Sequence, residues 1–182
     1  QSGSIKNHQL IAQGSIVNNG VIDFSSNLNE TGVEIIFTGS SNAIFNCSDA
    51  RLTNLRQTNG IILNKGNSAA SVLSFIPGNV FKVLSDGGSS AKGYLKIVSG
   101  TFNIIGSNSF SSPVFNTDVD YTIPSAGGFW LGNQNATVTA KDGSVFIHGD
   151  FKITNGVFNA GISGKNVLET TNGGHFKISG GI

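Results

Sequence analysis

Short stretches of alternating apolar and polar residues recur along the chain, each running into a glycine. The clearest is FKITNGVFN at 151–159, in which Phe151 and Ile153 alternate with Lys152 before an Asn-Gly pair. Alternation with a period of two is typical of a strand with one buried face. Asn and Gly adopt the positive φ angles that a sharp turn needs. Each stretch therefore predicts a strand, a corner and the start of a second strand.

Related stretches occur throughout the sequence. They are SIVNNGVIDFS at 15–25, LRQTNGIILNKG at 55–66, LKIVSGTFNIIG at 95–106 and FKISGGI at 176–182. When these and weaker copies are aligned on the glycine, the aligned positions recur about every 20 residues, with Gly20, Gly60 and Gly100 in equivalent places. Leucine-rich repeats share this period, but their leucine pattern is missing. A local hairpin at each Asn-Gly pair is the alternative to stacked coils.

The repeat favours an all-β fold over residues 1–182, a single-stranded parallel β-helix (β-solenoid) with coils of about 20 residues and about eight or nine turns. We expect phenylalanines to stack along its interior, namely Phe24, Phe45, Phe81, Phe102, Phe146, Phe151, Phe158 and Phe176. The stretch near 106–133 holds two of the three prolines and the single Trp, and it interrupts the repeat. An irregular insert is predicted there.

The composition argues against several classes of protein, namely disordered, nucleic-acid-binding and membrane-spanning chains. Hydrophobic residues make up 38% of the chain and charged residues 12%, which argues against a disordered chain. The net charge of +1 provides no strong field to attract nucleic acid. No apolar run approaches the roughly 20 residues of a membrane-spanning helix. Cys47 is the single cysteine, so no internal disulfide forms, and its apolar neighbours predict a buried thiol.

The two ends of the sequence indicate a piece of a longer protein. The chain contains no Met, and its first residues, QSGS, suit the end left after cleavage of a leader. The last residues, FKISGGI, begin another copy of the repeat. We therefore expect the N-terminal part of a longer exported chain that continues into further domains.

Basic residues occur four positions before several of the aligned glycines. They are Arg56, Lys96, Lys152 and Lys177. Equal phase on a solenoid means one face, so these residues are candidates for a basic stripe that binds an anionic polysaccharide. The alternative is that outward lysines keep the surface soluble and discourage edge pairing.

Two aromatic residues near the predicted insert are candidates for ligand contact. The rings of Trp130 and Tyr121 offer faces on which sugar rings stack. The alternative is that they fold back over the rod and cover it. In the same region, Asp118 and Asp120 are two residues apart, a spacing that suits a calcium ion or a structural pair.

No catalytic constellation stands out, and we expect a non-enzymatic protein without a cofactor or a bound metal. The histidines at 8, 148 and 175 follow no metal-ligand spacing. No nucleophile elbow, zinc-protease or phosphate-loop motif occurs. Asp86 and Asp142 precede glycines and are typical turn residues.

The phrases SIVNNGVIDFS, LKIVSGTFNIIG and FKITNGVFNAG resemble repeats of the β-helical, Gly/Asn/Ser-rich adhesin-like surface proteins of Bacteroidetes, which are type IX secretion substrates. NNGVID is also similar to filamentous-haemagglutinin-type β-helices. The resemblance implies a secreted or cell-surface stalk or adhesin, a role in adhesion or gliding motility, and passage through a secretion machinery. It implies an extracellular surface or polysaccharide as partner and brings no catalytic residue. A polysaccharide-binding or polysaccharide-degrading β-helix, a lyase or hydrolase, is the alternative. Ice binding is disfavoured because threonines are scattered.

Overall fold

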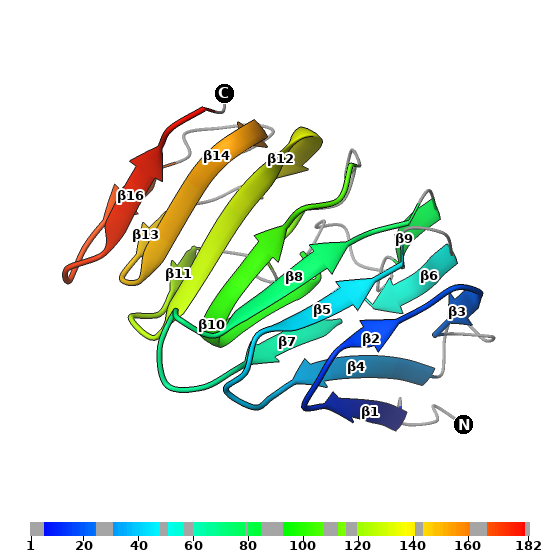
Figure 1. Cartoon of the computed structure of the whole chain (residues 1–182). Coiled ribbons are helices and arrows are strands. Elements are labelled where there is room, and N and C mark those ends of the chain that lie inside the picture. Colours follow the sequence, from blue (N-terminus) through cyan, green and yellow to red (C-terminus); the bar gives the residue numbers. More distant parts are fainter. Residues whose placement is uncertain are drawn as a thin grey trace, which may run out of the picture.

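The computed structural model is a β-solenoid in which parallel strands stack along one axis (Figure 1). It describes residues 6–24, 31–47, 51–56, 60–78, 80–84, 93–107, 113–115, 120–140, 144–160 and 167–180. All strand pairings among these residues are parallel. Within the described part of the chain, no helix has the length and apolar character of a membrane span. The predicted all-β solenoid is confirmed.

Each N-terminal coil has three strands, one in each of three layers. The first layer contains β1 (Lys6–Ala12), β4 (Thr31–Phe37), β7 (Ile61–Asn64) and the first half of β10 (Leu95–Ile104). The second layer contains β2 (Ile16–Val17), β5 (Ala43–Asn46), β8 (Val72–Ile76) and the second half of β10. The third layer contains β3 (Val21–Asp23), β6 (Arg51–Arg56) and β9 (Val80–Leu84).

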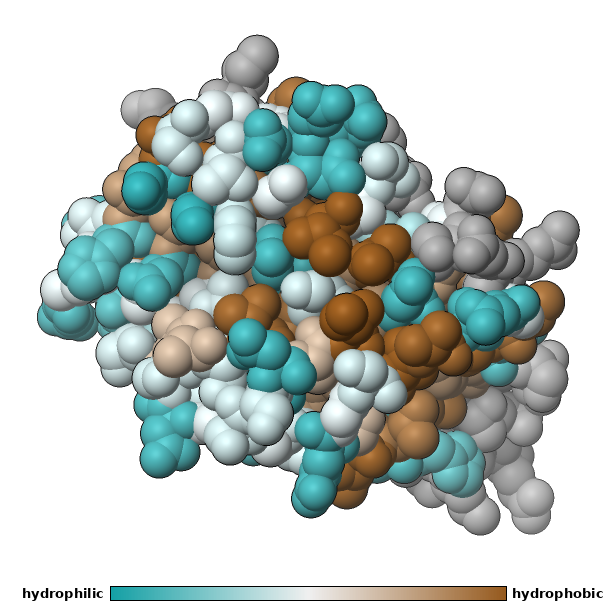
Figure 2. Space-filling view, viewed as in Figure 1, coloured by the Kyte–Doolittle hydropathy of each residue, from teal (hydrophilic) through white to brown (hydrophobic). Residues whose placement is uncertain are grey.

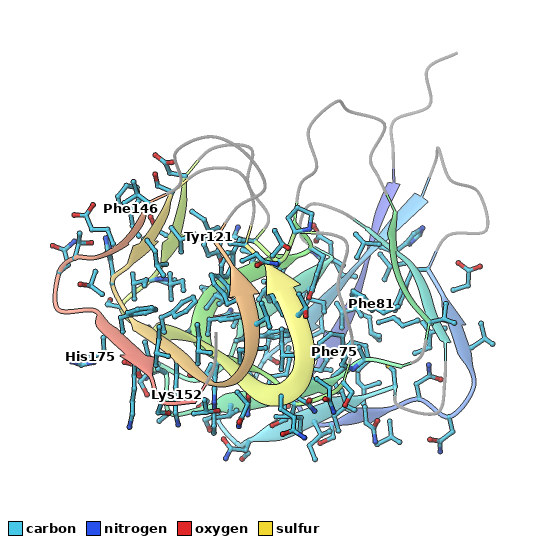
Figure 3. The ribbon with its side chains drawn as sticks, turned by 90° about the horizontal axis from the view of Figure 1, so that it is seen from above. Phe75, Phe81, Tyr121, Phe146, Lys152 and His175 are labelled. Atoms are coloured by element: carbon cyan, nitrogen blue, oxygen red, sulfur yellow. The ribbon has the colours of Figure 1, made fainter. Side chains whose placement is uncertain are left out.

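The second layer continues through the C-terminal coils and becomes the longest in the molecule. It adds the first parts of β12 (Gly127–Thr139) and β14 (Asp150–Asn159), and then β16 (His175–Ile178). A separate sheet of three short strands alternates with them along the chain, formed by β11 (Tyr121–Ile123), β13 (Val145–Ile147) and β15 (Leu168–Thr170). Both β12 and β14 bend around the core, as Figure 3 shows.

The coils are longer and fewer than the sequence repeat predicted. Lys6 pairs with Thr31, and Asp150 with His175, so equivalent residues in these coils are 25 positions apart. The solenoid has about five turns of about 25 residues. The predicted 20-residue coil and eight or nine turns are therefore wrong in number, although the stacking itself is right.

A column of glycines forms the corner between the first side of each coil and the second layer. Gly66 donates its N–H to the Gly39 carbonyl at 3.0 Å, and Gly100 pairs with Gly127. A Cβ atom on Gly149 would lie 2.0 Å from the Gly127 carbonyl oxygen. Backbones of successive coils approach at this corner more closely than any side chain permits.

Aromatic rings fill the interior along the axis. Phe45 packs on Phe75 with centroids 5.3 Å apart, Phe75 on Phe102 at 5.4 Å, and Phe129 on Phe151 at 5.4 Å. Offset and tilted ring pairs of this kind are favourable beyond the area that they bury.

Only part of the predicted phenylalanine set belongs to this core. Phe45, Phe102 and Phe151 are buried, and three more pack partly buried against the core, namely Phe24, Phe81 and Phe158. Phe176 is 42% exposed, and Phe146 lies on the outer side of its strand (Figure 3). Four buried rings were missed: Phe37, Phe75, Phe115 and Phe129.

The predicted insert near 106–133 is an ordinary coil where it is described. Tyr121–Ile123 forms β11, and β12 begins at Gly127 and pairs on both sides with neighbouring coils. Pro124 disturbs the sequence pattern but not the stacking, because it stands in the turn between β11 and β12. Residues 108–112 and 116–119 lie outside the described part.

Burial shifts the pKa of several groups in the interior toward their uncharged forms. Burial raises the pKa of Cys47 from 9.0 to about 11, partly offset by a hydrogen bond with Asn18. Burial also raises the pKa of Tyr94 and of Tyr121 well above its usual value. Burial lowers the pKa of Lys65, whose ammonium donates to the Thr38 carbonyl oxygen at 3.0 Å.

We expect alkaline pH to unfold the chain. Above pH 9 the unfolded chain loses the Cys47 proton while the folded chain keeps it to about pH 11, and above about pH 10 both tyrosines behave likewise. Each group then lowers the free energy of unfolding by up to about 1.4 kcal/mol per pH unit. Lys65 acts in the opposite direction, because losing its proton favours burial.

Urea denaturation at pH 7 to 11 measures this fall in stability. Cys47→Ala is the internal control, since it removes the part of the fall that begins near pH 9 and leaves the part that begins near pH 10. An unfolding free energy that stays level up to pH 11 would contradict the assignment of these groups to the core.

Candidate functional site

Outward side chains of the second layer line up in columns across the coils. In one column the strand registers place Ile44 beside Ser74, Ser74 beside Asn103, and Asn103 beside Trp130. Lys152 and Lys177 continue it. Apolar side chains gather over the N-terminal coils of this face, and polar ones over the C-terminal coils (Figure 2). The alternation of each strand produces the column, because its neighbours in sequence point into the core.

A shallow groove of about 430 Å³ lies along this column between β5 and β12. It is lined by Ser15, Asn42, Ala43, Ile44, Val72, Ser74, Asn103 and Trp130. Hydroxyl and amide groups thus alternate with aliphatic side chains and one indole. We call this surface the Trp130 groove.

Trp130 stands at the C-terminal end of the groove and is held from two directions. Its indole N–H donates to the Thr154 hydroxyl oxygen at 2.9 Å. The Lys152 ammonium lies 3.8 Å from the centre of the ring, a cation–π contact. These contacts fix the indole between Lys152 and the groove. The two residues that were predicted separately as ligand contacts are therefore neighbours.

Asn103 provides a buried polar atom next to this indole. Its side chain is 5% exposed, and its Oδ1 atom has no hydrogen-bond partner among the described residues. A buried acceptor without a donor costs about 1–3 kcal/mol. The sequence signal was available in TFNII, where Asn103 takes the outward position between two buried residues, but sequence reasoning missed it.

An acidic and a basic side chain lie in the adjacent outward column. His175 Nδ1 and Asp150 Oδ1 are 3.1 Å apart, and both side chains are largely exposed. Figure 3 shows His175 and Lys152 on the outer side of the ribbon. An exposed pair of this kind contributes little to stability.

Tyr121 does not belong to the surface site. Its side chain is 7% exposed, and its ring stacks on Phe115 with centroids 4.4 Å apart. Its hydroxyl oxygen accepts the Ile97 N–H at 2.8 Å. The Tyr121 ring thus lies in the core and links β11 to β10, so it offers no face to a sugar.

The four basic residues do not form one stripe. Lys152 and Lys177 are in register on the second layer. Lys96 is exposed on the outer face of the first layer, beside Ile62, and Arg56 belongs to the third layer, paired with Leu84. The prediction of one stripe is wrong because the repeated phrase marks different corners of the coil.

Only one of the two aspartates considered for calcium belongs to the described residues. Asp118 lies outside the described residues. Asp120 is exposed, and its Oδ1 accepts the Ser144 N–H of the next coil at 2.9 Å. Within the described ranges, no three His, Cys, Asp or Glu side chains gather as a metal site would require.

No family model, curated protein or solved structure matches the chain.

Proposed function

We propose that this chain is a non-enzymatic binding segment of a secreted or cell-surface protein, an adhesin or stalk that contacts an extracellular polysaccharide surface. The observation that supports the proposal is the outward column of the second layer, which places a groove, an indole and two lysines in line on one face. Polar and apolar groups in this mixture match the hydroxyls and C–H faces of sugars.

The stacked coils present the side chains of this face at regular intervals. Successive strands are about 4.8 Å apart, so side chains of equal phase meet a repeating polymer at regular intervals. Several weak contacts made together bind far more tightly than one, provided that the geometry lets them engage at once. The backbone ladder holds that geometry along the axis.

Adsorption to insoluble polysaccharides, neutral and acidic, tests the proposal. We expect the chain to be depleted from solution without release of sugar products. Lys177→Glu, on the second layer, should reduce adsorption severalfold, because it reverses a charge on the binding face. Lys96→Glu, a lysine of the same phrase on another layer, is the matched control and should adsorb as the parent chain does.

Two results would overturn the proposal. Equal loss of adsorption in both variants would mean that net charge and not the second-layer face governs binding. Release of sugar products that Asp150→Asn abolishes would instead establish the polysaccharide-degrading alternative, with the acid of the Asp150–His175 pair in a catalytic role.

A further inference from the structure

The Trp130 groove and the lysines beyond it form a graded surface. The groove end is aliphatic and neutral, with Ile44 and Val72 among its lining residues. Trp130 follows, and then the ammonium groups of Lys152 and Lys177. A ligand that lies along this column therefore meets apolar surface and hydroxyl-bearing side chains first and positive charge last.

We propose that this column is the binding track for an acidic polysaccharide, with one sugar ring in the groove against Trp130 and an acid group of the next sugar near Lys177. The inference rests on the proposed function and specifies its ligand. Sugar rings present apolar C–H faces to an indole, and carboxylate or sulfate groups pair with ammonium groups.

The unpaired acceptor of Asn103 favours a ligand that carries hydroxyl groups. Its unpaired Oδ1 is itself buried, and Asn103 is one of the residues that line the groove. The terminal torsion of an Asn amide is soft, so the oxygen turns toward a donor at small cost. A sugar hydroxyl in the groove supplies that donor and removes the penalty of the unpaired acceptor.

The position of Lys152 sets the direction of the track. Its ammonium covers Trp130 from the side of β14, so the groove side of the indole is the side next to Asn103. Lys177 is exposed one coil farther on and stands where an acid group of the bound chain would arrive. Asp150 lies in the adjacent column beside His175 and not in the track.

Trp130 is the single tryptophan of the chain, so its fluorescence reports on this site alone. We expect oligogalacturonate to change the emission of Trp130 in a saturable manner. A neutral cello-oligosaccharide of equal length should bind at least fivefold more weakly. Added salt should weaken the acidic ligand and not the neutral one, because screening acts on the charge contacts.

A pair of matched variants tests the place of binding. Ile44→Glu introduces a negative charge on the groove wall, at a side chain that is 44% exposed, and should weaken oligogalacturonate at least tenfold. Val98→Glu changes a side chain that is 42% exposed on the first layer, and should leave the affinity unchanged. Thermal unfolding of both variants checks that the fold is intact.

The outcomes separate this inference from the proposed function. Adsorption to polysaccharide with no change in Trp130 emission, or equal effects of Ile44→Glu and Val98→Glu, overturns the track and leaves the binding function standing. Equal affinity for the neutral ligand overturns its acidic specificity. No adsorption to any polysaccharide overturns both.

Discussion

Replacing Gly149 by alanine should destabilise the chain by about 3 kcal/mol or more, or prevent its folding. The added Cβ would lie 2.0 Å from the Gly127 carbonyl oxygen and 2.3 Å from that of Pro124. Both obstacles are backbone atoms of the preceding coil, which cannot turn aside as a side chain would. The two coils would have to separate locally, which breaks parallel pairing between β12 and β14. Urea denaturation of the two proteins measures the difference.

Gly14 provides the matched control for this substitution. It stands near the same corner in the first described coil, after β1, and a Cβ there meets no atom within 4 Å. Gly39, in the next coil, already places a Cβ 3.0 Å from the Gln13 carbonyl oxygen. We therefore expect Gly14→Ala to change the unfolding free energy by less than about 0.5 kcal/mol. Similar losses at Gly14 and Gly149 would show that the backbone preference of glycine in these turns matters and not the contact between coils.

The stacking of parallel strands was predictable from the sequence, but the length of the coil was not. The repeated phrase does not mark the same corner in every coil. A strand–glycine–strand phrase describes a corner, and each coil has several corners. Gly20 lies between β2 and β3, Gly60 immediately before β7, and Gly100 within β10 between the first and second layers. Aligning these three glycines joined different corners of successive coils and produced a false period.

The true column is hard to recognise because its spacing is irregular. Gly39, Gly66 and Gly100 share a corner, yet the loops between them differ in length, since loops vary while stacked strands do not. Hydrogen bonds between coils fix the register, and the residues they link are separated by different numbers of positions, from 20 for Thr137 and Val157 to 35 for Ser99 and Asn64. No local pattern carries that information.

The candidate site was only partly predictable for the same reason. Trp130 was identified by residue type and Lys152 by its position in the repeated phrase, and the coil register brings them together. Tyr121 has the same chemistry as a sugar-stacking residue, but the phase of β11 turns it inward. Ile44 has an ordinary side chain for a strand, and Asn103 stands out only as a polar residue in an apolar stretch. They become groove residues only because neighbouring coils place them beside Trp130.

The second large effect should come from Phe102→Ala. Phe102 is fully buried, its ring packs on Phe75, and its strand β10 joins β8 on one side to β12 on the other. Removing a buried phenylalanine leaves a cavity and typically costs about 3–5 kcal/mol. Phe176→Ala is the matched control. Phe176 lies in β16, the last strand of the second layer, where it is 42% exposed and packs on Phe151 of β14. We expect it to cost about 1 kcal/mol or less.

The location of the damage in Phe102→Ala distinguishes a stacked rod from a single cooperative core. In a solenoid each coil contacts only its neighbours, so stability is close to a sum of coil and interface contributions. Amide hydrogen exchange should therefore accelerate most in β8, β10 and β12, and least in β1 and in β16, which are farthest from the cavity along the strand order. Equal acceleration in all strands would mean that the coils unfold as one unit. The aromatic interior would then couple the whole length of the molecule, and a ligand bound at the Trp130 groove would stabilise all coils alike and not mainly those that line the groove.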